Sequence, residues 1–349
     1  MSDSRLGNFN LRSAGSVKRQ VVRMSPAELV KTEPLHEENT LPLLVQPSIK
    51  GISLASWGAS NKEWVESHLL KHGAILFRGF DVGEAPEFEQ FIRNVSGELL
   101  EYRERSSPRS QVSGFIYTST DYPASHDIFL HNENSYQKTY PMKIFFFGHT
   151  PSAQGGATPI ADSRKVYQRI EPKLRDRFIE KKWMYVRNFG DGFGLTWQTV
   201  FRTNDKAVVE EHCRRNDIIT EWKEGDRLRT RSILPPVERH PQTGELCWFN
   251  HATFFHISTL PELIREALLE DFAAEDLPTN TFYGDNSPIE PEVLEHLRDA
   301  YRQETVSFPW QQGDVLMLDN MLAAHGRAAY RGTRKILVGM AQPVTRASV

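Results

Sequence analysis

The segment "GDVLMLDNMLAAHGRAAYRGTRKILVGMA", residues 313–341, decides the fold of this 349-residue chain. It begins with "GDVLMLDN" (Gly313–Asn320) and ends with "KILVGMA" (Lys335–Ala341), and both runs are typical of buried strands. Between them lies a loop that contains "AAHGR" and so places His325 just after one apolar strand and near another. The segment therefore predicts two strands that hold a histidine between them.

Further apolar runs predict more strands in both halves of the chain. They are "AILFRGF" (Ala74–Phe80), "KIFFFG" (Lys143–Gly148) and "WMYVRNF" (Trp183–Phe189). Strands dominate both ends of the chain, and helical periodicity lies between them. The pattern favours a β-rich α+β fold with a double-stranded β-helix (jelly-roll) core and surrounding helices over a doubly wound sheet. No glycine-rich phosphate loop follows a strand, which argues against a nucleotide site.

The chain divides into a tail and one domain. Residues 1–23 are rich in Arg, Lys and Ser and poor in acidic residues, which predicts a disordered tail, with a transit peptide as the alternative. Residues 24–349 are predicted to form a single domain with a large insertion at about 190–309, where polar loops alternate with helices. Residues 103–127 predict a mobile loop beside the site, and the sequence leaves open whether this loop closes as a lid.

Composition excludes several classes of protein. The net charge of −3 provides no dominant basic field, so we expect no nucleic-acid partner. Two cysteines, Cys213 and Cys247, are too few for a disulfide framework or a Cys-rich zinc site and fit a reducing compartment. No apolar run approaches the roughly 18 residues that cross a bilayer, and the N-terminus lacks an apolar signal core. We therefore predict a cytoplasmic protein without a membrane partner.

The stretch "IFLHNENSYQ" (Ile128–Gln137) carries a candidate metal site. On a strand, residues i and i+2 point to the same face, so His131 and Glu133 converge while Asn132 faces away. A buried carboxylate or imidazole without a partner is costly, and a divalent metal would relieve both. His325 is the best-placed third ligand. Two histidines and one carboxylate form the facial triad of non-haem Fe(II) oxygenases, with coordination positions left open.

Three alternatives to an iron site are compatible with the same three side chains. A His and a Glu two residues apart occur on many solvated strand faces. The same triad could also hold zinc in a hydrolase, where metal-bound water attacks an ester or amide. The fold could also be non-catalytic and only bind a small molecule or a partner. The sequence around the motif distinguishes the iron site from a solvated strand face, and the complete triad argues against a non-catalytic fold. An assay of 2-oxoglutarate turnover with Fe(II) would distinguish the oxygenase from the hydrolase.

That surrounding sequence resembles a known family. His131-x-Glu133, then "GGATPIAD" (Gly155–Asp162), then "WQQGDVLMLDNMLAAHGRAAYRGTRKILVGMA" (Trp310–Ala341) is similar to the taurine dioxygenase superfamily of Fe(II)/2-oxoglutarate oxygenases. The resemblance covers about residues 70–345. It implies an Fe(II) cofactor, 2-oxoglutarate and O₂ as cosubstrates, and a small-molecule substrate.

Four other phrases resemble one subgroup of that superfamily. They are "RNFGDGFGLTWQTVF", "EWKEGDRLRTR", "HPQTGELCWFNHATFFH" and "YGDNSPIE". They are similar to the syringomycin-pathway aspartyl hydroxylase and related biosynthetic enzymes. The resemblance implies hydroxylation of an unactivated C–H bond in an amino acid or an amino-acid-derived group, free or tethered to a carrier protein, in secondary metabolism.

The resemblance assigns roles to the triad. His131, Glu133 and His325 match the iron ligands of the family. Iron halogenases of this class lack the carboxylate, so Glu133 favours hydroxylation. Oxidative cyclisation or desaturation remains an alternative, because the outcome depends on substrate geometry.

The resemblance also implies a site for 2-oxoglutarate. Arg334 matches the arginine that binds the far carboxylate, a role that suits the planar fork of a guanidinium. Arg331 and Lys335 are alternatives, because the spacing from the second histidine varies in the family. Thr158 matches a threonine whose hydroxyl reaches the same carboxylate, with a turn threonine that bonds its own backbone as the alternative.

Substrate contacts are expected in the segment between the two halves of the site. Asn250 falls where relatives line the substrate pocket, although an aromatic-rich strand is also typical of a core. Arg231, with Arg229, could clamp an acidic substrate or belong to a charged strand face. His251 and His256 are interpreted as core or rim histidines.

Overall fold

The computed structural model describes residues 29–36, 39–101, 110–119, 122–190, 192 and 194–346. The predicted tail, residues 1–23, lies outside the described residues, and so do residues 103–109 and 120–121 of the predicted mobile loop. The described part of that loop includes two short strands, β4 (Gln111–Ser113) and β5 (Ile116–Thr118). No described helix is both long enough and apolar enough to cross a membrane.

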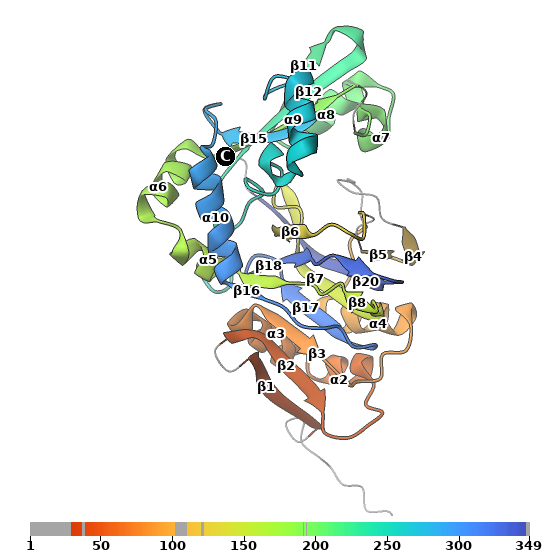
Figure 1. Ribbon diagram of the computed structural model, residues 1–349. Helices are drawn as coiled ribbons and strands as arrows, with labels where there is room; N and C mark the ends of the chain where they lie inside the picture. Colours follow the sequence, from red (N-terminus) through yellow and green to blue (C-terminus); the bar gives the residue numbers. More distant parts are fainter. Residues whose placement is uncertain are drawn as a thin grey trace, which may run out of the picture.

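An eight-stranded sheet forms the centre of the protein, with the order β1-β2-β3-β17-β7-β20-β5-β4 (Figure 1). Its longer strands are β1 (Val30–His36), β2 (Asn39–Pro47), β3 (Ala74–Phe77), β7 (Thr139–Thr150), β17 (Val315–Asp319) and β20 (Lys335–Thr345). The four strands β3, β17, β7 and β20 are neighbours, and each corresponds to an apolar run in the sequence. These strand predictions are confirmed.

Strand β17 shows why the central strands are continuously apolar. Val315 and Met317 join one hydrophobic cluster, while Leu316 and Leu318 join a second cluster on the opposite face. Successive side chains of a strand point to opposite faces, so a strand covered on both sides must be apolar at every position.

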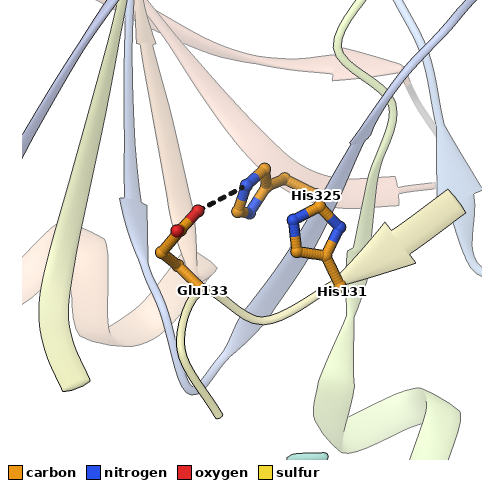
Figure 2. Close-up of side chains that lie close together, drawn as sticks. All are labelled: His131, Glu133 and His325. Atoms are coloured by element: carbon orange, nitrogen blue, oxygen red, sulfur yellow. Dashed lines mark ion pairs between the residues drawn. The ribbon is translucent and has the colours of Figure 1, made fainter. Parts of the chain in front are cut away.

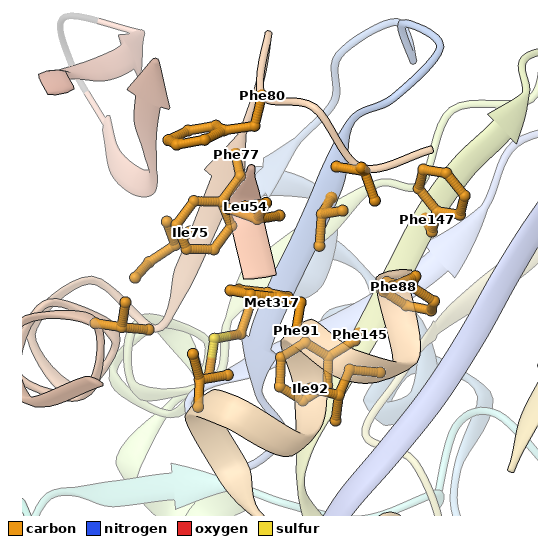
Figure 3. Close-up of a cluster of buried hydrophobic side chains, with 14 of the residues drawn as sticks. Leu54, Ile75, Phe77, Phe80, Phe88, Phe91, Ile92, Phe145, Phe147 and Met317 are labelled. Carbon is orange, nitrogen blue, oxygen red and sulfur yellow. The ribbon is translucent and has the colours of Figure 1, made fainter. Parts of the chain in front are cut away.

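Three helices cover one face of this sheet: α2 (Leu54–Ser60), α3 (Lys62–His72) and α4 (Ala85–Ser96). Figure 3 shows Phe88 and Phe91 of α4 packed against the sheet. The ring of Phe88 stacks on that of Phe147 with 5.3 Å between centroids, and the ring of Phe91 meets Phe145 edge to face at 6.0 Å. Aromatic pairs in these geometries add to the free energy gained by burial.

A four-stranded sheet packs on the other face. Its order is β16-β9-β18-β6, with β6 (Ile128–His131), β9 (Ile160–Asp162), β16 (Thr305–Val306) and β18 (Ala323–Arg327). Ile160 and Ala323 of this sheet share a cluster with Phe146 and Val338 of the central sheet. The segment "AAHGR", expected as a loop, is strand β18, because it pairs with β6 and β9. The predicted β-rich α+β class is confirmed.

Residues 190–309, predicted as an insertion, lie mainly in a third region, at the top of Figure 1. This region includes a four-stranded sheet in the order β11-β12-β10-β15, in which β10 (Trp183–Phe189) precedes the predicted insertion. The remaining strands are β8 (Gln154–Gly155), β11 (Ile218–Lys223), β12 (Arg227–Leu234), β13 (Val237–Arg239), β14 (Leu246–Trp248), β15 (Thr279–Tyr283) and β19 (Tyr330–Arg331), and two short 3₁₀ helices are η1 (Glu224–Asp226) and η2 (Ile257–Thr259). The remaining helices are α5 (Ser163–Arg169), α6 (Pro172–Lys181), α7 (Trp197–Phe201), α8 (Lys206–Arg215), α9 (Glu262–Asp271) and α10 (Pro291–Gln303).

Candidate metal centre

Antiparallel pairing of β6 with β18 sets His131 directly opposite His325. The centroids of the two imidazole rings lie 4.6 Å apart (Figure 2). Gly326 allows this close pairing, because a Cβ atom at that position would lie only 2.6 Å from the backbone oxygen of Ile128. The two histidines of the site are therefore held by strand pairing, although they are 194 residues apart (325 minus 131).

Glu133 reaches the same point from the turn that follows β6, whereas the i, i+2 argument assumed a continuous strand. The chain turns at Asn134, which has a left-handed φ of 54°. The Oε2 atom of Glu133 lies 3.6 Å from Nε2 of His325, and Figure 2 shows all three side chains pointing toward one another. Candidate ligand atoms of His131, Glu133 and His325 all lie within 4.8 Å of one another. The predicted convergence is present, but a turn produces it.

An asparagine that the sequence reasoning missed holds the backbone of Glu133. The Oδ1 atom of Asn320 accepts a hydrogen bond from the Glu133 N–H at 2.7 Å, and its Nδ2 donates to the Glu133 carbonyl at 2.9 Å. Asn132 returns the contact by donating to the Asn320 carbonyl at 2.7 Å. Both asparagine side chains are fully buried. A polar residue at the end of an apolar strand needs buried partners, and that requirement is the signal that points to Asn320.

The donor set fits Fe(II). His131 Nδ1 lies 2.8 Å from the carbonyl oxygen of Phe129, which can only accept, so Nδ1 carries the proton and Nε2 keeps the lone pair. The Nδ1 atom of His325 is buried without a hydrogen-bond partner among the described residues. Two imidazole nitrogens and one carboxylate, without a thiolate, match the ligand preference of Fe(II) in a facial triad.

Arg334 and Thr158 lie beside these ligands in a narrow depression, here called the polar recess. It is lined by Ser119, Ile128, His131, Phe146, Thr158, His325, Gly326, Arg327, Arg334 and Val338. Arg334 donates from Nε to the Gly156 carbonyl at 2.9 Å and from Nη1 to Ser119 Oγ at 3.1 Å. Burial, with the nearby Arg327, lowers the pKa of Arg334 to about 10. The guanidinium therefore stays positive at neutral pH.

Thr158 is 2% exposed, and its hydroxyl oxygen accepts a hydrogen bond from the indole N–H of Trp310 at 3.1 Å. The sequence alternative, a bond to its own backbone, is not among the hydrogen bonds of the described residues. Arg331 and Lys335, the alternatives to Arg334, do not line the polar recess, and Arg331 is exposed. The structure thus brings Arg334 and Thr158 together with the two histidines.

A larger hollow of about 280 Å³ borders His131 and Glu133 and is here called the aromatic cavity. Its lining residues include His131, Glu133, Asn134, Tyr136, His251, Phe254, Phe255 and His256. The ring of Phe254 lies 4.4 Å from that of His131, centroid to centroid. The two cavities share Ile128 and His131, so they meet beside the candidate metal ligands.

His251 and His256 line the aromatic cavity and are neutral. His251 Nδ1 lies 2.6 Å from Ser135 Oγ, and its ring stacks on Phe255 at 4.7 Å. Burial, reinforced by the nearby His131, holds the pKa of His251 well below its usual range. Burial, with Arg298 nearby, lowers the pKa of His256 to about 4. Both match the interpretation as core or rim histidines.

The structure does not bring the other predicted substrate contacts to either cavity. Asn250 is buried, donates from Nδ2 to the Pro236 carbonyl and accepts at Oδ1 from the Ala252 N–H. Arg231 lies on β12 and pairs with Glu221 at 2.8 Å. Neither Asn250 nor Arg231 is among the residues that line the aromatic cavity.

Arg229, the companion of Arg231, is also engaged away from the site. It donates to Asn188 Oδ1 at 2.9 Å and pairs with Asp276. Its charge therefore stabilises the third region. Both arginines therefore fit the alternative interpretation from the sequence, a charged face of a strand.

Comparison with known proteins places most of the chain in one group. Residues 31–341 match the family described as "Taurine catabolism dioxygenase TauD, TfdA family". The dapdiamide synthesis protein DdaC of Enterobacter agglomerans is 38% identical over 315 residues, which cover 88% of this chain and 96% of that protein. The tyrosine isonitrile desaturase of Erwinia amylovora is 22% identical over 88% of this chain and 90% of its own length.

Solved structures share the fold. PvcB from Pseudomonas aeruginosa superposes with a TM-score of 0.54 at 16% identity and covers 96% of this chain and 94% of its own. A taurine dioxygenase from Burkholderia xenovorans has a TM-score of 0.51 at 16% identity, with 92% and 96% covered. At 16% identity these two structures show that the fold is shared and carry no conclusion about function.

Proposed function

The chain belongs to the taurine catabolism dioxygenase TauD, TfdA family, and from that premise we propose that it hydroxylates an unactivated C–H bond of an amino acid or amino-acid-derived substrate in secondary metabolism. It is a non-haem Fe(II)/2-oxoglutarate-dependent dioxygenase. The proposal rests above all on one observation: His131, Glu133 and His325 meet at the junction of a polar recess and an aromatic cavity. We interpret the two stacked sheets as the jelly-roll core of this family.

The chemistry balances with one molecule each of 2-oxoglutarate and O₂. One oxygen atom enters the substrate C–H bond and the other enters succinate, while 2-oxoglutarate loses CO₂. Bound Fe(II) supplies the site at which O₂ and 2-oxoglutarate react. The chain itself binds, orients and shields the reactants.

In this proposal Arg334 holds the far carboxylate of 2-oxoglutarate. Its guanidinium remains charged, and its existing bonds to Gly156 and Ser119 fix its direction within the polar recess. The hydroxyl of Thr158 accepts from Trp310 and can donate its own proton to the same carboxylate. Glycine suits position 156, because its φ of 71° is left-handed and a Cβ atom there would clash with Oγ of Ser152 and lie 3.0 Å from Cδ of Arg334.

The aromatic cavity receives the substrate. Phe254 lies against His131, so a substrate carbon that packs on this ring is held beside the metal ligands. Arg327 supports the wall of the cavity by donating to the carbonyls of Tyr122, Pro123 and His126. This role favours packing for Arg327 over direct participation in catalysis.

Mass spectrometry of products tests the proposal. The purified protein is given Fe(II), 2-oxoglutarate and air with a panel of amino acids, free and loaded on a carrier protein. We expect products heavier by one oxygen atom, formed together with succinate. Products lighter by two hydrogens would instead identify a desaturase or cyclase. The similarity to the tyrosine isonitrile desaturase supports this alternative. Hydrolysis of an ester or amide without O₂ or 2-oxoglutarate would refute the oxygenase function.

A further inference from the structure

A buried histidine connects the hairpin of β13 and β14 to the end of strand β17. His240 directly follows β13 and is 1% exposed, and its Nε2 atom lies 3.2 Å from Oδ2 of Asp319. Its Nδ1 atom accepts hydrogen bonds from the N–H groups of Gln242 at 3.2 Å and Thr243 at 3.1 Å. Because Nδ1 uses its lone pair for these bonds, Nε2 carries the proton and donates a hydrogen bond to the carboxylate.

The carboxylate of Asp319 also fixes the turn that follows β17. Asp319 is fully buried, and its Oδ1 atom accepts from the N–H groups of Met321 at 3.0 Å and Leu322 at 3.1 Å. A buried carboxylate is costly without such donors, so its orientation is set where all of them reach it. His240 supplies the donor that comes from outside the turn.

This turn contributes to the metal site in two ways. Asn320, directly after Asp319, holds the backbone N–H and carbonyl of Glu133. Strand β18, which carries His325, begins where the turn ends. The positions of two of the three candidate ligands therefore depend on the geometry of the turn.

Apolar packing brings the hairpin and the turn together but does not orient them. Cys247 and Phe249 share a buried cluster with Met321 and Leu322. Hydrophobic burial is non-directional, whereas a hydrogen bond needs its donor at a defined distance and angle. The hydrogen bond from His240 is therefore a contact that fixes how the turn is rotated against the hairpin.

We propose that His240 is a positioning residue of the metal site: through Asp319 it fixes the turn from which Asn320 holds Glu133 as a ligand. The inference rests on the metal site of the proposed function and adds to it a residue from the predicted insertion. Loss of a group that orients a metal ligand lowers metal affinity about 10–100-fold, and we expect the lower end of this range because His240 acts through two other side chains.

Two substitutions of His240 separate its donor from its acceptor. In His240→Gln the amide nitrogen takes the place of the imidazole Nε2 and keeps the bond to Asp319, while the acceptor for the Gln242 and Thr243 N–H groups is lost. In His240→Asn the amide oxygen takes the place of Nδ1 and keeps that acceptor, but the shorter side chain does not reach Asp319. A role in positioning requires the donor, and a role confined to the hairpin requires the acceptor.

A matched pair of aspartates lies at the two ends of β17. Asp314, directly before the strand, is fully buried like Asp319, accepts from the Gln311 N–H at 2.8 Å and pairs with Arg78 at 2.7 Å. Asp314→Asn and Asp319→Asn each remove one buried charge from the same strand. Only Asp319 holds the turn beside the metal ligands, so Asp314→Asn reports the general cost of such a substitution.

The experiment measures Co(II) binding to each metal-free protein by visible absorption, together with its thermal unfolding. We expect His240→Asn and Asp319→Asn to weaken Co(II) binding about tenfold, and His240→Gln and Asp314→Asn to stay within about threefold of the wild type. Asp314→Asn should nevertheless lower the Tm as Asp319→Asn does. If Asp319→Asn does not fold, the comparison between the two variants of His240 decides.

Three results would overturn the inference. They are an unchanged Co(II) affinity in His240→Asn, an equal loss of affinity in His240→Gln, and an equal loss in Asp314→Asn. The proposed function is judged separately, by succinate release from 2-oxoglutarate in the Fe(II)-loaded wild type. Co(II) affinities that follow the prediction without any succinate release would refute the oxygenase function and leave the role of His240 in place.

Discussion

The polar recess and the aromatic cavity both border His131 but are built from different kinds of structure. The recess takes Phe146, His325 and Val338 from paired strands of the two sheets. The cavity takes much of its wall from residues 254–260, a connection between β14 and α9 that includes the short helix η2. Paired strands hold the two histidines, whereas Glu133, Thr158 and Arg334 lie in turns or just outside strands. In the proposed function these two groups of residues would bind metal and cosubstrate, and the segment 254–260 would shape the space for the substrate.

The largest effect is expected where the two cavities meet. Glu133→Ala should reduce hydroxylation by more than the roughly 10–100-fold that loss of an outer-shell partner costs, because it removes a metal ligand. The fold should persist, since Asn320 contacts the backbone of Glu133 and these bonds do not need its side chain. Product mass spectrometry and circular dichroism check both points. Full activity in this variant would show that Glu133 is not a metal ligand.

Arg334→Ala tests the assignment of the polar recess to 2-oxoglutarate. Loss of a charge-assisted contact worth about 1.5–3 kcal/mol should raise the KM for 2-oxoglutarate about 10- to 100-fold and leave the KM for the substrate nearly unchanged. Arg331→Ala is the matched control, because Arg331 is exposed and does not line the recess. Steady-state kinetics with each reactant varied in turn separates the two constants. Equal effects of both variants would contradict the assignment.

Phe254→Ala is the counterpart in the aromatic cavity. Its ring packs beside His131, so truncation should raise the KM for the substrate by about tenfold while the KM for 2-oxoglutarate stays constant. Opposite responses to Arg334→Ala and Phe254→Ala would establish that the cavities serve different reactants. If Phe254→Ala raised the KM for 2-oxoglutarate instead, the assignment of the recess to 2-oxoglutarate and of the cavity to the substrate would be wrong.

The last prediction concerns stability and pH and lies outside catalysis. The pKa of His256 is lowered to about 4 in the folded protein against 6.5 for the ordinary group, so the unfolded chain binds the proton first as the pH falls. The free energy of unfolding should therefore decrease as the pH falls below about 6.5, by about 2 kcal/mol between pH 7 and 5 from this residue. His256→Asn keeps an acceptor for the Ser258 N–H and should make this decrease smaller. Urea unfolding of both proteins at pH 7 and pH 5 measures this decrease in the free energy of unfolding. An equal decrease in the wild type and in His256→Asn would show that His256 does not cause it.

The sequence by itself determined the central strands and indicated which side chains form the candidate metal site. The apolar run at Val315–Leu318 is buried on both faces, and this burial leaves a pattern that is readable without coordinates. The pair His131 and Glu133 is local in sequence, and its chemistry restricts what can satisfy two buried polar groups.

Tertiary structure alone decided how those residues meet and which others matter. Glu133 converges on His325 because of a turn and the backbone clamp of Asn320, and neither follows from the spacing of two residues. Arg231 had the right charge for a substrate contact, but its strand pairs in another sheet and its charge is taken by Glu221. Partners distant in the chain set the position and the charge balance of a side chain, so these outcomes depend on the packed fold.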